Sequence, residues 1–271
     1  MRKIPFVLMI VFIVILLQTL VFHRGMYFAP PTNLQDVRDI NIFSHVLGEF
    51  IDVYEKGDGT VLFDFSHDNN FEPEELNVLA SRIISRGYSV EYLKENKSLE
   101  KELEHVDSFV VILPVTPFSE EEIDQVKNFV DGGGKLLMIA DPTRDSEINA
   151  LSSNFGIIFW NDYLYNLKDN DGNFQYIYLS DFKENSITKD LDRVVFYVSS
   201  SIYPSEEGIM FTDENTYSSS KGIKGKYSPM ALTDDSKVLA IGDLTFLTEP
   251  YNVLDNNQLI SNIADYLTSS S

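Results

Sequence analysis

The sequence predicts an α/β fold built on a mainly parallel sheet. Near-continuous apolar runs at Thr60–His67, Phe109–Pro114 and Lys135–Asp141 are typical of parallel strands that are buried on both faces. Helical patterns with clear first and last residues lie between these runs. Over residues 60–141 the expected order is therefore strand, helix, strand, strand, helix, strand.

The composition of the chain excludes several classes of function. Its 271 residues are 44% hydrophobic and 13% aromatic, which is enough for a sizeable core. The formal net charge of −21 argues against nucleic acid or an anionic lipid surface as a partner, because both would be repelled. No cysteine is present, so disulfides, thiolate catalysis and cysteine-based metal sites are excluded.

The first segment, residues 1–24, is predicted to be a transmembrane anchor. An uncharged apolar run over 4–22 follows Arg2 and Lys3, and as a helix it would span about 28 Å, close to the hydrocarbon thickness of a bilayer. A cleavable signal peptide is the alternative, but no small-x-small site follows the run. We therefore expect a single-pass membrane protein with a cytoplasmic amino terminus and an extracytoplasmic globular domain.

Residues 25–58 are predicted to be a juxtamembrane linker with an amphipathic helix. Pro30 and Pro31 make a stiff spacer, and apolar residues then recur at helical spacing between Phe43 and Tyr54. This pattern predicts a helix over Asp39–Tyr54. Its apolar face packs either on its own domain or on a transmembrane or juxtamembrane helix of a partner.

Two helices of the predicted domain, residues 59–271, carry strong local signals. The first has Pro73 in its first turn and ends at Gly87. The second begins at Ser119, and Glu122 completes a capping box in which each side chain bonds the other residue's backbone N–H. Gly132–Gly134 follows a helix and precedes a strand, so we interpret it as a helix stop and not as a phosphate loop.

Beyond Asp141 the pattern continues with weaker signals, and residues 166–226 carry mostly short strand candidates and turns. The expected elements are a helix near Ser146–Phe155, a strand region at Ile157–Tyr165, strands at Val194–Val198 and Gly208–Thr212, a last buried strand at Lys237–Asp243 and a closing helix capped by Asp255 or Asn256.

Several motifs together resemble a known family. They are Phe63–His67, Arg86–Val90, Asp107–Pro114 with Phe118–Glu120, Phe129–Leu136, Ile241–Asp243 and Asp255–Leu259. This set is similar to the class I glutamine amidotransferase-like superfamily, and within it to the non-catalytic branch found in membrane proteins associated with ABC transporters, gliding motility and intraflagellar transport. The resemblance implies a flavodoxin-like three-layer α/β sandwich.

The departures from that family indicate that its chemistry is lost. Active members carry a nucleophilic cysteine at a strand-to-helix elbow and a His-x-Glu further on, whereas the equivalent position here is Ala140–Arg144. All four histidines precede this elbow, so no downstream base could activate a serine in its place. We therefore expect a protein that is not an enzyme, with no catalytic residue, metal or cofactor.

A cleft is nevertheless expected at the carboxyl ends of the strands, where ligands bind in open α/β sheets. Structural roles as caps and loop braces are the alternative for the same residues. The candidate ligand-binding residues are Asp64, Ser66, His67, Thr116, Asp141, Thr143, Arg144 and Asp243.

Three functional hypotheses follow. The leading one is a membrane-anchored, non-catalytic binding or scaffold subunit of a membrane-associated assembly, such as an ABC-transporter-linked one, with a membrane protein as its partner. The second is a sensor of a small ligand, a sugar or polyol, that uses the cleft with Phe159, Trp160 and Tyr163. The third is a metal-dependent hydrolase that uses the three cleft aspartates and His67.

Overall fold

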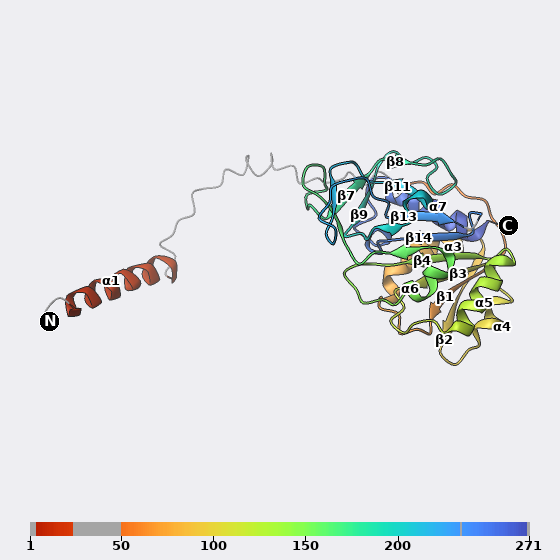
Figure 1. Cartoon of the computed structure of the whole chain (residues 1–271), viewed down its shortest axis with the longest axis horizontal. Coiled ribbons are helices and arrows are strands. Elements are labelled where there is room, and N and C mark those ends of the chain that lie inside the picture. Colours follow the sequence, from red (N-terminus) through yellow and green to blue (C-terminus); the bar gives the residue numbers. More distant parts are fainter. Residues whose placement is uncertain (1–3, 24–49, 234, 270–271) are drawn as a thin grey trace. The chain divides into compact units, whose positions relative to one another are not determined.

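The computed structural model describes residues 4–23, 50–233 and 235–269 of the chain (Figure 1). The chain divides into two compact units, Met1–Ser44 and His45–Ser271, and each is described by itself. The domain boundaries expected from the sequence, after residues 24 and 58, stay predictions.

The described part of the first unit is helix α1 (Ile4–His23). Among the described residues, no helix is long and apolar enough to cross a membrane. This finding contradicts the predicted anchor over residues 4–22, so the predicted single-pass membrane localisation is wrong as well.

The second unit is a mixed α/β fold around an eight-stranded sheet. Pairings from β2 to β14 are parallel, and those from β14 to β8 are antiparallel. The expected parallel strands are confirmed. In spatial order the strands are β2 (Tyr88–Lys94), β1 (Gly59–Phe65), β3 (Ser108–Ile112), β4 (Lys135–Ile139), β14 (Val238–Ile241), β13 (Met230–Thr233), β11 (Gly208–Phe211) and β8 (Asp181–Phe182).

Helices surround this sheet and follow the expected order (Figure 1). The capping box of α5 is present in full, because Ser119 Oγ accepts the N–H of Glu122 and Glu122 Oε2 accepts the N–H of Ser119. The helices are η1 (Pro73–Leu76), α3 (Asn77–Ser85), α4 (Leu99–Leu103), α5 (Glu120–Asp131), α6 (Asn149–Ser152), η2 (Ser153–Phe155), η3 (Ser205–Glu207), η4 (Thr245–Leu247) and α7 (Asn256–Thr268).

One expected cap is wrong. Asp255 precedes α7, but its side chain makes no cap hydrogen bond to that helix. Its Oδ2 accepts instead the backbone N–H groups of Asp192 and Arg193, each at 2.8 Å. Asn256 Oδ1 likewise accepts the N–H of Val195. Both side chains therefore hold the 192–195 segment against the start of α7.

Alternate residues of the parallel strands build two hydrophobic cores, because successive side chains of a strand point to opposite faces. Val61 and Phe63 belong to a core that includes the apolar side chains of α3 and α7. Leu62 and Val111 belong to a second core with those of α4 and α5. The near-continuous apolar runs of the sequence thus reflect burial on both faces.

The region 158–218 adds short strands outside the main sheet. They form three two-stranded ladders, β5 with β10, β6 with β12, and β7 with β9. The strand expected at Val194–Val198 is confirmed as β9, and the strand region expected at Ile157–Tyr165 contains β5 and most of β6. The sequence gave no indication of β7, β10 and β12, which have only two to four residues each. Their bounds are β5 (Ile158–Phe159), β6 (Leu164–Asn166), β7 (Tyr176–Leu179), β9 (Val194–Tyr197), β10 (Ile202–Tyr203) and β12 (Thr216–Ser218).

The segment that precedes β1 is tied to the domain by Arg86. This guanidinium is fully buried and bonds the Asp52 carboxylate through both terminal nitrogens, at 3.0 and 3.1 Å. It also bonds Asp265 at 2.6 Å and Ser261 Oγ at 2.8 Å, both on α7. The expected helix over Asp39–Tyr54 lies outside the described residues up to position 49, and the described remainder is not helical.

Arg86→Gln is expected to lower the free energy of unfolding by about 3 kcal/mol, because the change removes a buried cation that two carboxylates share. This value is at the low end for buried pairs, since Asp265 stays half exposed. Urea unfolding followed by circular dichroism measures it. Arg193→Gln is the matched control, because its pair with Asp169 is exposed and should contribute less than about 1 kcal/mol. Equal losses in the two variants would contradict the structural role of Arg86.

Candidate functional site

The residues predicted for the cleft separate into two clusters at the carboxyl ends of the parallel strands. Asp64 is the penultimate residue of β1 and Ser66 and His67 follow that strand, whereas Asp141 and Asp243 follow β4 and β14. Strand β3 lies between β1 and β4 in the sheet. The four residues suggested for a metal-dependent hydrolase are therefore divided between the clusters. Among the described residues, no group of three or more histidines and carboxylates is arranged to hold a metal ion.

The first cluster is centred on the buried carboxylate of Asp64. Asp64 Oδ1 accepts the backbone N–H of Ser66 at 3.1 Å and its hydroxyl at 2.7 Å. Asp64 Oδ2 accepts the side-chain amide of Asn69 at 3.2 Å. His67 Nδ1 lies 3.0 Å from both carboxylate oxygens. Together these contacts account for both oxygens of Asp64.

His67 connects this cluster to α5. Its Nε2 lies 3.6 Å from Glu122 Oε1, the same glutamate that completes the capping box. The ring stacks on Phe118, with centroids 3.7 Å apart, and the residue is buried. Burial by itself lowers the pKa of His67, but the hydrogen bond and charge of Asp64, with the charge of Glu122, outweigh burial and raise that pKa above its ordinary value.

The first cluster contains a serine, a histidine and an aspartate, but not in the arrangement of a catalytic triad. In a triad the serine bonds one ring nitrogen and the carboxylate bonds the other. Here Ser66 Oγ lies 3.1 Å from His67 Nδ1, the same nitrogen that Asp64 binds. His67 Nε2 faces Glu122 instead. Ser66 and Asp64 therefore share one ring nitrogen, so His67 cannot accept the proton of Ser66 on one nitrogen while Asp64 holds the other, as the triad mechanism requires.

The second cluster contains two buried aspartates. Asp141 Oδ1 accepts the N–H of Thr143 at 2.9 Å and its hydroxyl at 2.5 Å, which closes a tight turn after β4. Asp243 accepts the backbone N–H groups of Tyr197 and Thr245. Burial and the nearby charge of Asp141 raise the pKa of Asp243 well above its ordinary value. The charge of Asp141 thus affects the protonation of Asp243.

The side chains of Arg144 and Thr116 bind other residues of the domain. The guanidinium of Arg144 bonds both oxygens of Glu75, at 2.7 and 2.5 Å, and so joins the loop after β4 to η1. Its hydrogen bond to Glu75 is the main reason why the pKa of Arg144 is raised. Thr116 is exposed and donates its hydroxyl to Asp68 at 2.8 Å. Both side chains therefore already have partners within the domain.

Cavities lie along this edge of the domain. One of about 330 Å³ is lined by Asp141, Arg144, Phe159 and Trp160, among others. A second, of about 590 Å³, lies between the loop after β4 and the loop before η1, and shares Arg144 with the first. Three of the eight predicted residues, Asp141, Thr143 and Arg144, line the smaller cavity, and the ligand site as a whole stays a prediction.

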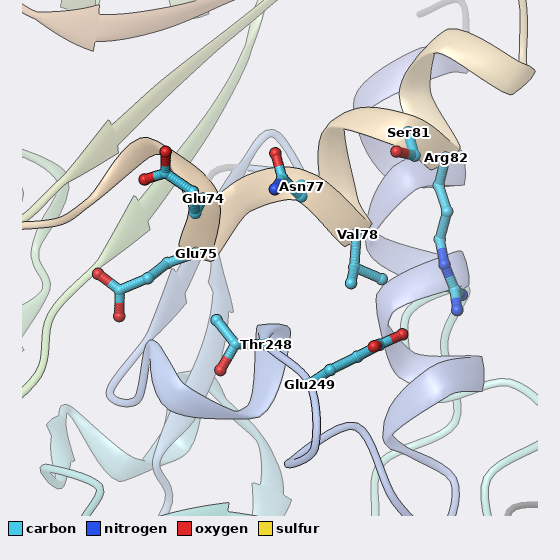
Figure 2. Close-up of a pocket in the computed structure, with 8 residues that line it drawn as sticks. All are labelled: Glu74, Glu75, Asn77, Val78, Ser81, Arg82, Thr248 and Glu249. Atoms are coloured by element: carbon cyan, nitrogen blue, oxygen red, sulfur yellow. The ribbon is translucent and has the colours of Figure 1, made fainter.

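A larger groove of about 720 Å³ lies between α3 and the end of η4. Figure 2 shows Val78 and Arg82 projecting from α3 toward Thr248 and Glu249, whereas Asn77 points away from them. Glu75 lines both this groove and the 590 Å³ cavity, so the two adjoin. The sequence gave no indication of this groove, because its walls come from segments that are far apart in the chain.

Sequence reasoning also missed three residues that complete the first cluster. Asn69 and Phe118 carried no signal as site residues, because both lie in short loops. Glu122 was identified only as half of a capping box. Its second contact, to His67, depends on how α5 packs beside β1 and could not be derived from spacing.

Comparison with known proteins gives one family match. The family model of the IFT52 GIFT domain matches residues 60–176, which run from β1 to the start of β7. No curated protein matches the chain. The matched residues include the whole first cluster and the loop from Asp141 to Arg144.

Solved structures show the same fold. The N-terminal domain of mmIFT52 superposes with a TM-score of 0.62 at 18% identity, covering 78% of this chain and 98% of that one. Two others have TM-scores too low to support an argument. They are an exo-β-1,4-mannosidase from Opitutaceae bacterium strain TAV5 (0.43, 15% identity, 79% of this chain and 37% of that one) and a cytoplasmic protein from Salmonella typhimurium (0.48, 11% identity, 78% and 100%).

These findings correct two expectations. The resemblance to the class I glutamine amidotransferase-like superfamily is wrong, because the matching family is the IFT52 GIFT domain and no amidotransferase-like family is indicated. The motifs that suggested it are strand ends, caps and turns, which other α/β domains of similar topology also require. The expected function as a membrane-anchored scaffold of that family, linked to ABC transporters, is wrong for the same reason.

His67 should make stability depend on pH. Since its pKa is raised in the folded state, its stabilising contribution is fully present below about pH 6.5 and is lost as pH rises through the folded-state pKa. The difference in free energy of unfolding between wild type and His67→Gln is therefore expected to be larger at about pH 6 than at about pH 9. Urea unfolding at both values measures it.

His105→Gln serves as the control for that comparison, because His105 is exposed and the substitution should leave the pH dependence of the wild type in place. A difference between wild type and His67→Gln that grows toward alkaline pH would contradict the raised pKa.

Proposed function

We propose that this chain is a non-catalytic, protein-binding component of a multiprotein complex. IFT52, whose GIFT domain matches residues 60–176, is a component of an intraflagellar transport complex. The fold that the chain shares with the N-terminal domain of mmIFT52 supports the same class of role. The proposal concerns the globular unit and requires no membrane segment.

The proposal that the chain is non-catalytic is supported by the first cluster, whose polar side chains bind one another and Glu122. Ser66 donates to Asp64, and both ring nitrogens of His67 face carboxylates. His67 is also buried, with 3% of its surface exposed. A nucleophile needs an adjacent base with a free nitrogen, and neither Ser66 nor His67 is in that state. These residues brace the ends of β1 and α5.

We also propose the finer description of the fold as a flavodoxin-like three-layer sandwich. It is supported by the two hydrophobic cores, one with α3 and α7 and the other with α4 and α5. In such a domain the surface available to a protein partner is formed by loops and helices, because the sheet faces are covered. The grooves at the strand ends and beside α3 belong to that surface.

Crosslinking followed by affinity purification of the full tagged chain from its native cells is expected to recover the same set of proteins repeatedly. The tag alone is the control. The purified chain is also expected to release no ammonia from glutamine, because no activated nucleophile is present. Repeated recovery of the chain alone, or ammonia release that Ser66→Ala abolishes, would contradict the proposal.

A further inference from the structure

The cavity of about 330 Å³ beside Asp141 contains a carboxylate oxygen with no partner in the described part of the chain. Asp141 is 3% exposed, and its Oδ1 is occupied by Thr143. Its Oδ2 accepts no hydrogen bond from a described residue. Since no fully buried side-chain oxygen or nitrogen among the described residues lacks a partner, Asp141 Oδ2 is reached by solvent, and the cavity that Asp141 lines is that solvent space.

No cation of the described chain neutralises this oxygen by direct contact. Arg144 lines the same cavity, but both of its terminal nitrogens bond Glu75. Lys221 lies over the ring of Trp160, with its Nζ 4.3 Å from the ring centroid, and does not line the cavity. The wall therefore presents a buried carboxylate, the exposed Asp145 and the accessible part of Trp160.

Carboxylates and aromatic rings are the groups that bind ammonium and guanidinium ions in proteins. Trp160 already contacts one ammonium group, that of Lys221, which shows that its ring is placed for such contacts. The cavity is at the small end of the range for ligand sites, so it is large enough for one long side chain. A single basic side chain thus fits both its chemistry and its size.

The surface next to this cavity is also lined by carboxylates. The 590 Å³ cavity shares Thr143, Arg144 and Asp145 with it, and the groove beside α3 in turn shares Glu75 (Figure 2). Both arginines along this path are engaged, Arg144 with Glu75 and Arg82 with Asn257. The carboxylates that line the path are Glu72, Glu74, Glu75, Asp141, Asp145 and Glu249.

We infer that the cavity formed by Asp141 and Trp160 binds an arginine or lysine side chain of a protein partner, presented by an extended basic segment that continues along the adjoining acidic grooves. This inference rests on the proposed protein-binding function and names the chemistry of the partner. The guanidinium or ammonium group bonds Asp141 Oδ2, and its aliphatic stem contacts Trp160. Complementary charge along the grooves sets the direction of the segment.

The test uses the full chain and a short fluorescein-labelled peptide of alternating arginine and glycine, with a glutamine-for-arginine twin. Fluorescence anisotropy is expected to show binding of the arginine peptide only. Asp141→Asn, which keeps the shape of the side chain, is expected to weaken that binding at least about tenfold. Trp160→Ala, at a partly exposed residue, should weaken it severalfold, and thermal unfolding confirms that both variants fold.

Asp190→Asn is the matched control, because it removes the same charge at an exposed site outside the cavities and should leave peptide affinity unchanged. Equal affinity of wild type and Asp141→Asn, or equal binding of both peptides, would overturn the inference. Crosslinking purification with Asp141→Asn separates the two proposals. Partners recovered equally by wild type and variant would refute only this inference, whereas no partner with wild type would refute the proposed function.

Discussion

A single buried guanidinium holds three separate parts of the globular unit together. Arg86 stands at the end of α3, binds Asp52 from the segment before β1, and binds Asp265 and Ser261 from α7. Burial of a cation is unfavourable unless its donors are satisfied, and here the acceptors come from the segment before β1, from α3 and from α7. This network therefore ties the segment before β1 to α3 and α7.

Buried polar groups at the carboxyl ends of the strands are also mostly satisfied by hydrogen bonds within the domain. Asp64 and Asp243 are buried there, and backbone or side-chain donors occupy both oxygens of each. Asp141 differs, because only one of its oxygens is used. Buried polar groups that are satisfied internally specify the fold, whereas the one left open to solvent can meet another molecule. Asp64 and Asp243 therefore have structural roles, whereas Asp141 belongs to the candidate contact surface.

Much of the parallel half could be predicted from local patterns. The apolar runs of β1, β3 and β4 and the Ser119–Glu122 box depend on neighbours in the sequence, so periodicity and spacing are sufficient to find them. The antiparallel strand β13 and the short strands β7, β10 and β12 have only two to four residues each, too few to show a period. The His67–Glu122 contact, the Arg86 network and the role of Asp255 depend on tertiary packing, which spacing does not encode. The family expectation failed because shared fold elements were interpreted as shared ancestry and function.

The position of β14 has a consequence for how the protein is made. This strand lies between β4 and β13 in the sheet, yet Val238 pairs with Leu136 across about half of the domain's sequence. During synthesis the ribosome releases β1 to β4 long before β14, so β4 stays an open sheet edge over that interval. The long loop that must close makes this pairing the slow, entropically costly part of folding. The nascent chain is therefore most exposed to aggregation, and most dependent on chaperones, in the time between β4 and β14.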